Sequence, residues 1–262
     1  MSSSATSFRH LVLPKEHGSW SLAFEPVALG LLVAPSAPGA ALALAVAAGF
    51  FVRRPLKLSC TCAAVDARRV PAAMWAMIFS VTAVSALAFS VSSAGELGPL
   101  WPLLLAAPCG AAFLWFDLRN DMREAEAELA GSAAFAVLPA VFATLAGWAP
   151  AAALALAVLS LARSMPTVLT VRTYLRLQKR QTVNPLLPLA AAAVALVACA
   201  WLARQQLLPL AAVALPALLL GRTALFVTPL RPGLTAKQVG MIEAGLGVVY
   251  LGGTALAYGL TV

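Results

Sequence analysis

The amino-acid sequence predicts an all-α protein, a polytopic transmembrane helix bundle with about nine spans. Only 11% of the 262 residues are charged, against about 25% in a typical soluble domain, and the mean hydropathy is +0.89. The apolar segments are mostly about 16 to 22 residues long, close to the roughly 20 residues with which a helix crosses a bilayer. Runs such as AAALALAVLSLA do not alternate and are rich in the helix formers alanine and leucine, which excludes a β-barrel.

Proline, glycine and charged residues divide the chain into these spans, which form a single membrane domain over residues 1–262. A turn at Pro35–Gly39 separates the first two spans, and a basic loop follows the second. Charged residues follow the fourth span, a turn at Trp148–Pro150 separates the fifth from the sixth, and a second basic loop follows the sixth. The expected spans are 17–34, 39–56, 71–92, 99–118, 127–147, 150–165, 186–203, 207–226 and 238–260.

The basic residues lie almost entirely on one side of this arrangement. The N-terminal segment and the second, fourth, sixth and eighth loops hold 17 of the 18 lysines and arginines, and only Arg204 lies on the other side. In this count Arg163 belongs to the sixth loop and Arg222 to the eighth. Cytoplasmic loops concentrate Lys and Arg, so we expect the N-terminus inside and the C-terminus outside. The net charge of +8 then reflects contact with an anionic leaflet, and no nucleic acid is expected as a partner.

An acidic pattern follows the fourth span, in FDLRNDMREAEAELAG. If this stretch is one helix, four carboxylates stand at i, i+4, i+7 and i+11 and share one face. Carboxylates at this spacing suit Mg²⁺, which completes its shell with phosphate oxygens and water. A solvated helix face, or pairing with basic side chains, is the alternative. The four residues are Asp117, Asp121, Glu124 and Glu128.

A basic pattern follows the sixth span, in RSMPTVLTVRTYLRLQKR. Arg172, Arg176 and Lys179 stand at i, i+4 and i+7, and Pro166 is expected to interrupt the helix between Arg163 and these residues. Arginine binds carboxylates and phosphates alike. The basic residues therefore either pair with the acidic pattern or share one cavity with it around an anionic ligand. Lys179 is expected to be an anchor at the inner leaflet.

Two carboxylates are predicted to lie inside the membrane, near the same side. Glu25 shares a helix face with His17 in the first span, and Glu243 lies about one turn into the last span, beyond Lys237. An ionisable residue within a span is costly, normally faces the bundle interior, and points to a functional site. The alternative is a buried ion pair with an arginine.

Three stretches, PKEHGSW, RSMPTVLTVRTYLRL and AKQVGMIEAGLG, resemble the YwiC-like family of bacterial integral membrane proteins. The resemblance covers nearly the whole chain and implies a multi-pass protein of the bacterial cytoplasmic (inner) membrane. It implies no particular chemistry.

A more distant resemblance is to the UbiA-type prenyltransferases, which are nine-helix bundles whose cytoplasmic loops cap a central cavity. That family binds a prenyl diphosphate through Mg²⁺ with an NDxxDxxxD motif and a DxxxD motif. Residues 120–128 read NDxxExxxE here, and Asp117 with Asp121 reads DxxxD, although the motif follows the fourth span rather than the second. The resemblance implies an isoprenoid or other lipid substrate. The residues expected to hold Mg²⁺ are Asp117, Asp121, Glu124 and Glu128; to bind substrate, Lys15, Arg163, Arg172, Arg176 and Lys237; and to act in catalysis, His17, Glu25 and Glu243.

Two other functions fit the same sequence. In a proton-coupled transporter, Glu25 and Glu243 would be the titrating or substrate-binding groups, with Arg163 as their partner. A non-catalytic accessory membrane protein of a respiratory complex is the third hypothesis.

Overall fold

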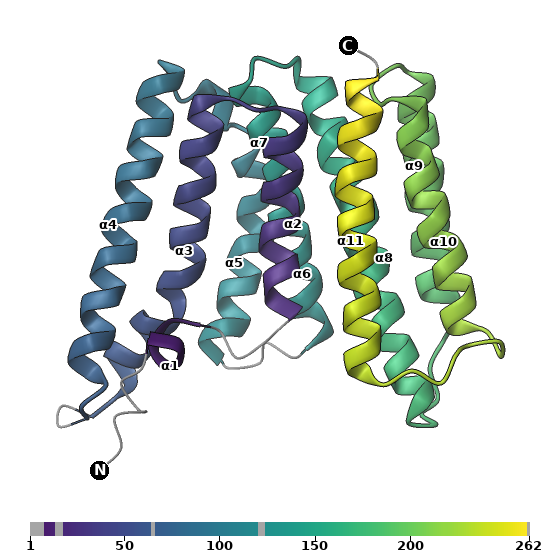
Figure 1. Ribbon diagram of the computed structural model, residues 1–262, viewed down its shortest axis with the longest axis horizontal. Helices are drawn as coiled ribbons and strands as arrows, with labels where there is room; N and C mark the ends of the chain where they lie inside the picture. Colours follow the sequence, from purple (N-terminus) through teal and green to yellow (C-terminus); the bar gives the residue numbers. More distant parts are fainter. Residues whose placement is uncertain (1–7, 14–17, 64–65, 120–123, 261–262) are drawn as a thin grey trace.

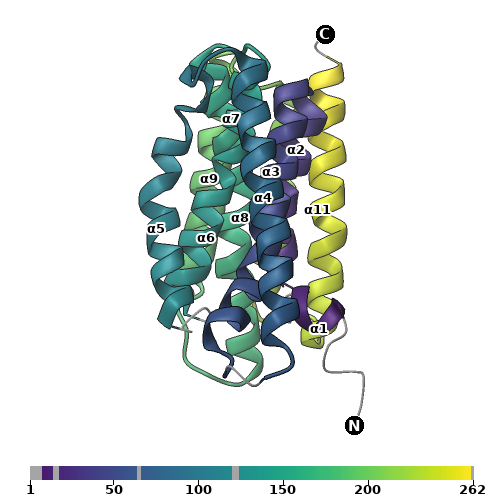
Figure 2. The ribbon, with the colours of Figure 1, turned by 90° about the vertical axis from the view of Figure 1, so that its left-hand side faces the viewer.

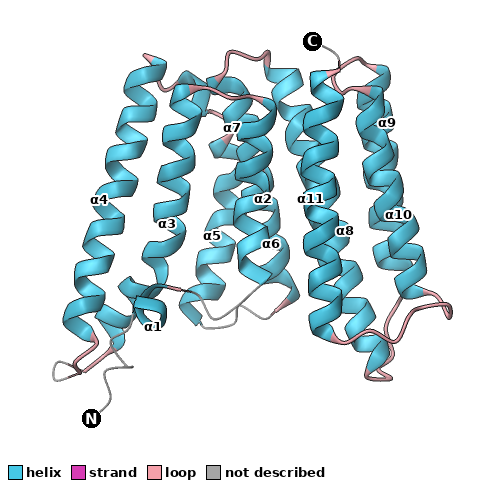
Figure 3. Cartoon of the chain, viewed as in Figure 1, coloured by secondary structure: helices cyan, strands magenta, loops and turns pink. Residues whose placement is uncertain are grey.

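The computed structural model of the chain describes residues 8–13, 18–63, 66–119 and 124–260. Within these ranges the chain is built from helices and turns, with no β-strand (Figure 3). Its helices are α1 Phe8–Val12, α2 Gly18–Val33, α3 Ala37–Thr61, α4 Arg69–Ala94, η1 Gly98–Leu100, α5 Leu103–Arg119, α6 Ala125–Ala136, α7 Leu138–Leu145, α8 Pro150–Gln178, α9 Leu186–Arg204, η2 Leu210–Val213, α10 Ala214–Val227 and α11 Ala236–Gly259.

Seven helical segments in the described part of the chain are long and apolar enough to cross a membrane. They include α6 with α7 as one segment and η2 with α10 as another. The chain is therefore a multi-pass membrane protein, and the predicted all-α bundle is confirmed. The other two expected spans fall on α2, whose apolar part Trp20–Val33 is shorter, and on α5, which has 17 residues. The total of nine crossings stays a prediction.

The long helices lie nearly parallel to one another in one bundle (Figure 1). α3 and α4 pack together at one edge, α9 and α10 lie at the opposite edge, and α2, α7, α8 and α11 lie between them (Figures 1 and 2). α1 and the last turn of α11 lie at opposite ends of the bundle. Opposite ends are what an odd number of crossings requires.

Short sequence signals set several helix ends. Ser36 precedes α3, and its Oγ accepts a hydrogen bond from the backbone N–H of Gly39 at 3.1 Å. Thr235 and Gln238 form a capping box at the start of α11, in which each side chain binds a backbone N–H that the first turn leaves unpaired. Gly147, in the turn before α8, has a φ of 83°, which glycine adopts without steric cost.

α7 lies in the centre of the bundle, and all of its residues from Leu138 to Leu145 are buried. The Phe142 ring packs closely against α2 and α3. A Cβ added at Gly30 would lie 2.4 Å from this ring, and one at Gly39 would lie 3.1 Å from it. Since small residues let membrane helices approach closely, these two glycines allow α2 and α3 to pack on α7.

The acidic stretch does not form the single helix that its spacing predicts. α5 ends at Arg119, α6 begins at Ala125, and the two helices pack against each other. Glu124 has an extended backbone with φ −67° and ψ 150°. The predicted common face of Asp117, Glu124 and Glu128 is therefore wrong, because the chain reverses between the two helices.

α8 runs from Pro150 to Gln178 and includes Pro166, so the predicted interruption at this proline is wrong. The expected span 150–165 is only the first part of this helix. Thr167 Oγ1 donates a hydrogen bond to the Arg163 carbonyl and Thr170 Oγ1 to the Pro166 carbonyl, each at 2.6 Å. Both bonds go to carbonyls other than that of Ala162, which is the carbonyl that loses its N–H donor at Pro166.

Candidate functional site

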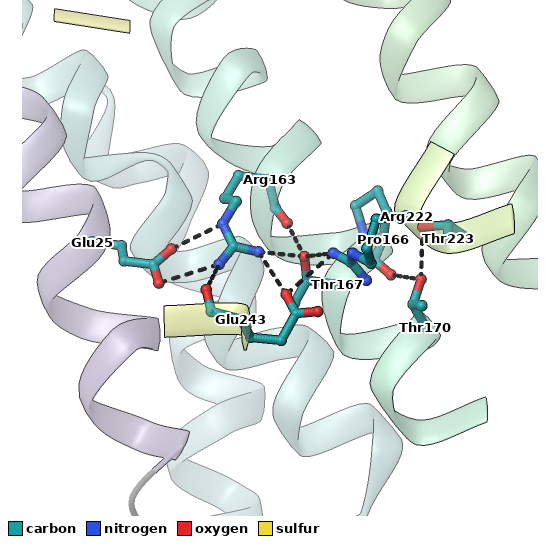
Figure 4. A network of polar contacts seen from close by, with 8 residues as sticks. All are labelled: Glu25, Arg163, Pro166, Thr167, Thr170, Arg222, Thr223 and Glu243. Atoms are coloured by element: carbon teal, nitrogen blue, oxygen red, sulfur yellow. Dashed lines mark hydrogen bonds and ion pairs between the residues drawn. The ribbon is translucent and has the colours of Figure 1, made fainter. Parts of the chain in front are cut away.

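Four charged side chains from four helices meet inside the bundle (Figure 4). Glu25 comes from α2, Arg163 from α8, Arg222 from α10 and Glu243 from α11. We call them the charged cluster. Glu25 and Glu243 each follow the start of their helix by about two turns, which places them about 10 Å from that end of the bundle. Arg163, Arg222 and Glu243 are each less than a tenth exposed.

Arg163 is the centre of the cluster. On one side its Nε lies 3.2 Å from Glu25 Oε2, and its Nη2 donates a hydrogen bond to Glu25 Oε1 at 3.4 Å. On the other side, Nη1 donates to Glu243 Oε2 at 3.2 Å, and Nη2 donates to the Glu243 carbonyl at 2.8 Å. One guanidinium therefore joins α2, α8 and α11.

Arg222 extends the cluster towards α10. Its Nη2 lies 3.2 Å from Glu243 Oε2 and donates a hydrogen bond to Thr167 Oγ1 at 2.8 Å. The same hydroxyl accepts a bond from Arg163 Nη1 at 2.6 Å. Beside it, the hydroxyls of Thr170 and Thr223 lie 3.0 Å apart (Figure 4).

Some polar atoms of the cluster are buried without a hydrogen-bond partner among the described residues. They are Nε of Arg163, which lies near Glu25 without a hydrogen bond to it, Nε and Nη1 of Arg222, and Oε1 of Glu243. An unpaired buried polar group costs about 1–3 kcal/mol. The inner part of the cluster can therefore accept water or a polar ligand, which would recover this energy.

The formal charges of the cluster cancel, because two carboxylates face two guanidinium groups. Charges in a membrane interior persist where they pair with one another. The structure therefore pairs both intramembrane carboxylates with arginines, which is one of the two arrangements that the sequence allows. Removing a single member would leave an uncompensated charge behind.

Glu25 is the member of the cluster that is most accessible from outside. Its side chain is 21% exposed, against 7% for Arg163 and 11% for Glu243. It forms part of the wall of a groove of about 560 Å³ between α2, α3 and α11. The groove is lined by Trp20, Ser21, Phe24, Glu25, Ala28, Phe51 and Leu251.

Aromatic rings form most of the wall on the α2 and α3 side. The Trp20 ring lies 5.8 Å from the Phe24 ring and 5.5 Å from the Phe51 ring, between centroids. Phe50 packs behind them, 5.4 Å from Phe24. The groove is therefore an apolar surface in helices of the membrane bundle, with Glu25 among its lining residues.

Gly247 lets Glu25 reach Arg163. A Cβ added at Gly247 would lie 2.5 Å from Glu25 Oε1 and 3.3 Å from Arg163 Nη2. Gly245, one of its neighbours on α11, has nothing within 4 Å of the same position. A side chain at Gly247 would therefore require the Glu25 carboxylate to move, and the ion pair with it.

A family profile described as YwiC-like protein matches residues 13–143 of this chain. The chain belongs to the YwiC-like family. The matched residues include Glu25, whereas the other three members of the charged cluster lie beyond them. The YwiC-like chain has no match among curated proteins and none among solved structures. Its resemblance to the UbiA-type prenyltransferases stays a prediction.

The acidic residues predicted to bind Mg²⁺ are dispersed in the YwiC-like chain. Asp117 Oδ2 pairs with Arg53 Nη2 at 2.9 Å, and Glu128 Oε2 pairs with Arg172 Nη1 at 2.9 Å. Glu124 is exposed at the start of α6, and Asp121 lies outside the described residues. No group of three or more His, Cys, Asp or Glu side chains that could hold a metal ion occurs in the ranges that the structure describes. The Mg²⁺ site stays a prediction, because one or two carboxylates can hold this ion together with phosphate oxygens and water.

The other predicted residues lie away from the cluster or cannot be placed. Arg176 is exposed in the last turn of α8, and Lys237 is exposed in the first turn of α11. Arg172 pairs with Glu128. For this residue, the structure agrees with the alternative in which the basic pattern pairs with the acidic one. Lys15 and His17 lie outside the described residues.

Arg222 is the residue of the site that sequence reasoning missed. The sequence assigned it to the eighth loop and Arg163 to the sixth, but both side chains are buried within helices. The assignment was wrong because basic residues were counted as loop residues even where apolar segments surround them. The run LLLGRTALFV, with one arginine among apolar residues, is the signal that marks Arg222 as intramembrane.

Proposed function

We propose that this protein is an intramembrane transferase that takes a long-chain lipid from the bilayer and acts on its polar end. The observation that carries the proposal is the groove whose wall contains Glu25. Its remaining lining is apolar or aromatic apart from Ser21. A lipid tail in this groove would bring its head to Glu25, the charged residue among the described residues of the lining.

The charged cluster supplies the chemistry that such a transfer needs. Glu25 is an acceptor-only group when ionised, so it can orient or deprotonate the hydroxyl of an acceptor. Arg163 and Arg222 are fixed, buried positive groups. Such preorganised groups stabilise negative charge that develops on a leaving oxygen.

The proposed reaction is a transfer, as the UbiA-type resemblance implies, but it does not use the Mg²⁺ of that family. Asp117 and Glu128 are each held in an ion pair with an arginine. No step of the proposed reaction therefore passes through Mg²⁺.

We also propose that the end of the bundle where α2 and α11 begin faces the cytoplasm of a bacterium, across the inner membrane. The loops at this end, which join α3 to α4 and α8 to α9, carry Arg68, Lys179 and Arg180. Basic loops face the cytoplasm. The charged cluster would then lie close to the cytoplasmic interface, where soluble co-substrates arrive.

A product assay in nanodiscs tests the proposal. Purified protein is reconstituted with lipid extract of the expression host, and a soluble extract of small molecules is added. Mass spectrometry of the lipids then follows the reaction. We expect a lipid product that accumulates with the wild-type protein and not with Glu25→Gln. Equal lipid profiles for wild type, variant and empty nanodiscs would contradict the transferase.

A groove variant shows whether the reaction uses the proposed lipid site. Ala28→Trp places a large side chain in the groove, and we expect it to reduce product formation at least tenfold. Val84→Trp, on the outer face of α4, is the control because Val84 is 68% exposed. A product that survives Ala28→Trp at the wild-type rate would place the reaction elsewhere.

A proton-coupled transporter is the second candidate function. The observation in its favour is that Arg163 is shared by two carboxylates, on α2 and α11. Protonation of one carboxylate would shift Arg163 towards the other and could move the two helices relative to each other. Proton uptake into proteoliposomes that depends on a substrate and is lost in Glu243→Gln would favour this function. The accessory role in a respiratory complex stays a prediction.

A further inference from the structure

We infer that the polar end of the lipid is uncharged and donates a hydroxyl hydrogen to Glu25, so that the substrate is a long-chain alcohol or phenol rather than a lipid diphosphate. This inference rests on the proposed lipid site. It names the chemical class of the ligand from the charge, the hydrogen-bonding capacity and the lining of the groove.

The charge balance of the cluster is the first argument. Two glutamates and two arginines already cancel where they meet inside the bundle. A diphosphate would add at least two negative charges that no further cation of the cluster compensates. Burying such uncompensated charge is far more costly than burying a neutral hydroxyl that forms a hydrogen bond.

The lining of the groove is the second argument. Of the seven residues that line it, none is a lysine or an arginine, within the part of the chain that the structure describes. The guanidinium of Arg163 contacts both carboxylate oxygens of Glu25. Among the described residues that line the groove, a phosphate would therefore meet a carboxylate and no cation.

The hydrogen-bonding capacity of Glu25 is the third argument. A carboxylate offers about four lone-pair positions on its two oxygens. Arg163 Nε and Nη2 approach one position on each oxygen. The side chain is 21% exposed and is one of the residues that line the groove, so the remaining acceptor positions are the ones that a donating ligand would use. An acceptor-only group selects a ligand that donates, and an O–H bond to an ionised oxygen is a strong one.

Three probes with one common isoprenoid tail test the inference. Farnesol carries a hydroxyl donor, farnesyl methyl ether has the same oxygen without the hydrogen, and farnesyl diphosphate carries the charged head. Binding to wild-type protein in nanodiscs is measured by calorimetry, with empty nanodiscs as the correction for partition into lipid. We expect farnesol to bind about tenfold more tightly than the ether, as one hydrogen bond to a charged group predicts. We expect the diphosphate to bind more weakly than farnesol.

The variant Glu25→Gln should change the binding affinities of two probes in opposite directions. It keeps the shape of the side chain and removes one negative charge, so the cluster becomes net positive. We expect farnesol to bind more weakly to this variant and farnesyl diphosphate to bind more tightly. Because the two affinities change in opposite directions, general damage to the fold cannot produce the result.

The outcomes distinguish a failure of the uncharged head group from a failure of the lipid site. If the diphosphate binds wild-type protein more tightly than farnesol, or if Glu25→Gln weakens both probes, the uncharged head is refuted while the lipid site stands. If no probe binds, or if Ala28→Trp binds every probe as the wild type does, the lipid site itself is refuted and the inference with it.

Discussion

Replacing Arg163 with methionine tests whether this guanidinium holds the bundle interior together. Methionine fills a similar volume and carries no charge. Glu25 then loses its contacts to both carboxylate oxygens, whereas Glu243 keeps Arg222 at 3.2 Å. The main cost therefore arises from one stranded carboxylate.

The magnitude follows from how deeply that carboxylate is buried. Breaking a buried ion pair by removing one partner costs about 3–5 kcal/mol. Because the Glu25 side chain is 21% exposed, we expect the free energy of unfolding to fall by about 3 kcal/mol, the lower end of that range. The double variant Arg163→Met with Glu25→Gln removes the stranded charge and should recover more than half of the loss.

Unfolding by sodium dodecyl sulphate in mixed micelles, followed by circular dichroism, measures these differences. Arg172→Met on the same helix is the control, because its ion pair with Glu128 is partly exposed and should contribute less than about 1 kcal/mol. Two results would refute the reasoning. One is an equal loss for Arg163→Met and Arg172→Met. The other is a double variant that is no more stable than Arg163→Met alone.

Three further substitutions probe other parts of the structure. Gly247→Ala places a Cβ 2.5 Å from a carboxylate oxygen of the cluster and should lower the midpoint of thermal unfolding. The control Gly245→Ala should leave the midpoint unchanged or raise it. Equal midpoints for the two variants would contradict the close approach at Gly247. Gly30→Ala places a Cβ 2.4 Å from a phenyl ring of α7 and should cost about 1–3 kcal/mol in unfolding free energy by overpacking, with Gly49→Ala, which meets nothing within 4 Å, as the harmless control. Asp66 lies in the turn between α3 and α4. Hydrogen bonds from the side chain and backbone of Arg68 lower the pKa of the Asp66 carboxyl group well below the ordinary range. A lowered pKa in the folded state stabilises the fold above the ordinary pKa of about 3.9, and the effect is lost as the pH falls below that value. Between pH 5 and pH 3, the free energy of unfolding should therefore fall less in an Asp66→Asn variant than in the wild type. The difference between the two corresponds to the titration of one carboxylate.

The apolar spans could be predicted from the sequence because the bilayer acts on each segment separately. Every backbone polar group must be paired within a span, so an apolar run of sufficient length becomes a helix whatever its neighbours are. The turn at Ser36 and the capping box at Thr235 are equally local signals. Glu25 and Glu243 could be singled out for the same reason, since a carboxylate in an apolar run is visible without any knowledge of its partners.

The same local rules failed where packing decided the outcome. Residues 117–128 contain no glycine or proline, so helix propensity alone favours one continuous helix. The chain instead reverses between α5 and α6, which pack against each other. At Pro166 the local rule predicted a break, but α8 continues through the proline and packs against α6, α7, α9 and α10.

The sequence by itself determined that this protein is a helical membrane bundle with carboxylates near one end of it. Only the tertiary structure decided which residues those carboxylates meet. Glu25 and Arg163 are 138 residues apart in the chain, and Arg163 and Glu243 are 80 apart. Such pairs depend on how helices rotate and pack, and no periodicity within one segment encodes that. The groove beside Glu25 arises in the same way, because its walls come from the consecutive helices α2 and α3 and from α11 at the far end of the sequence.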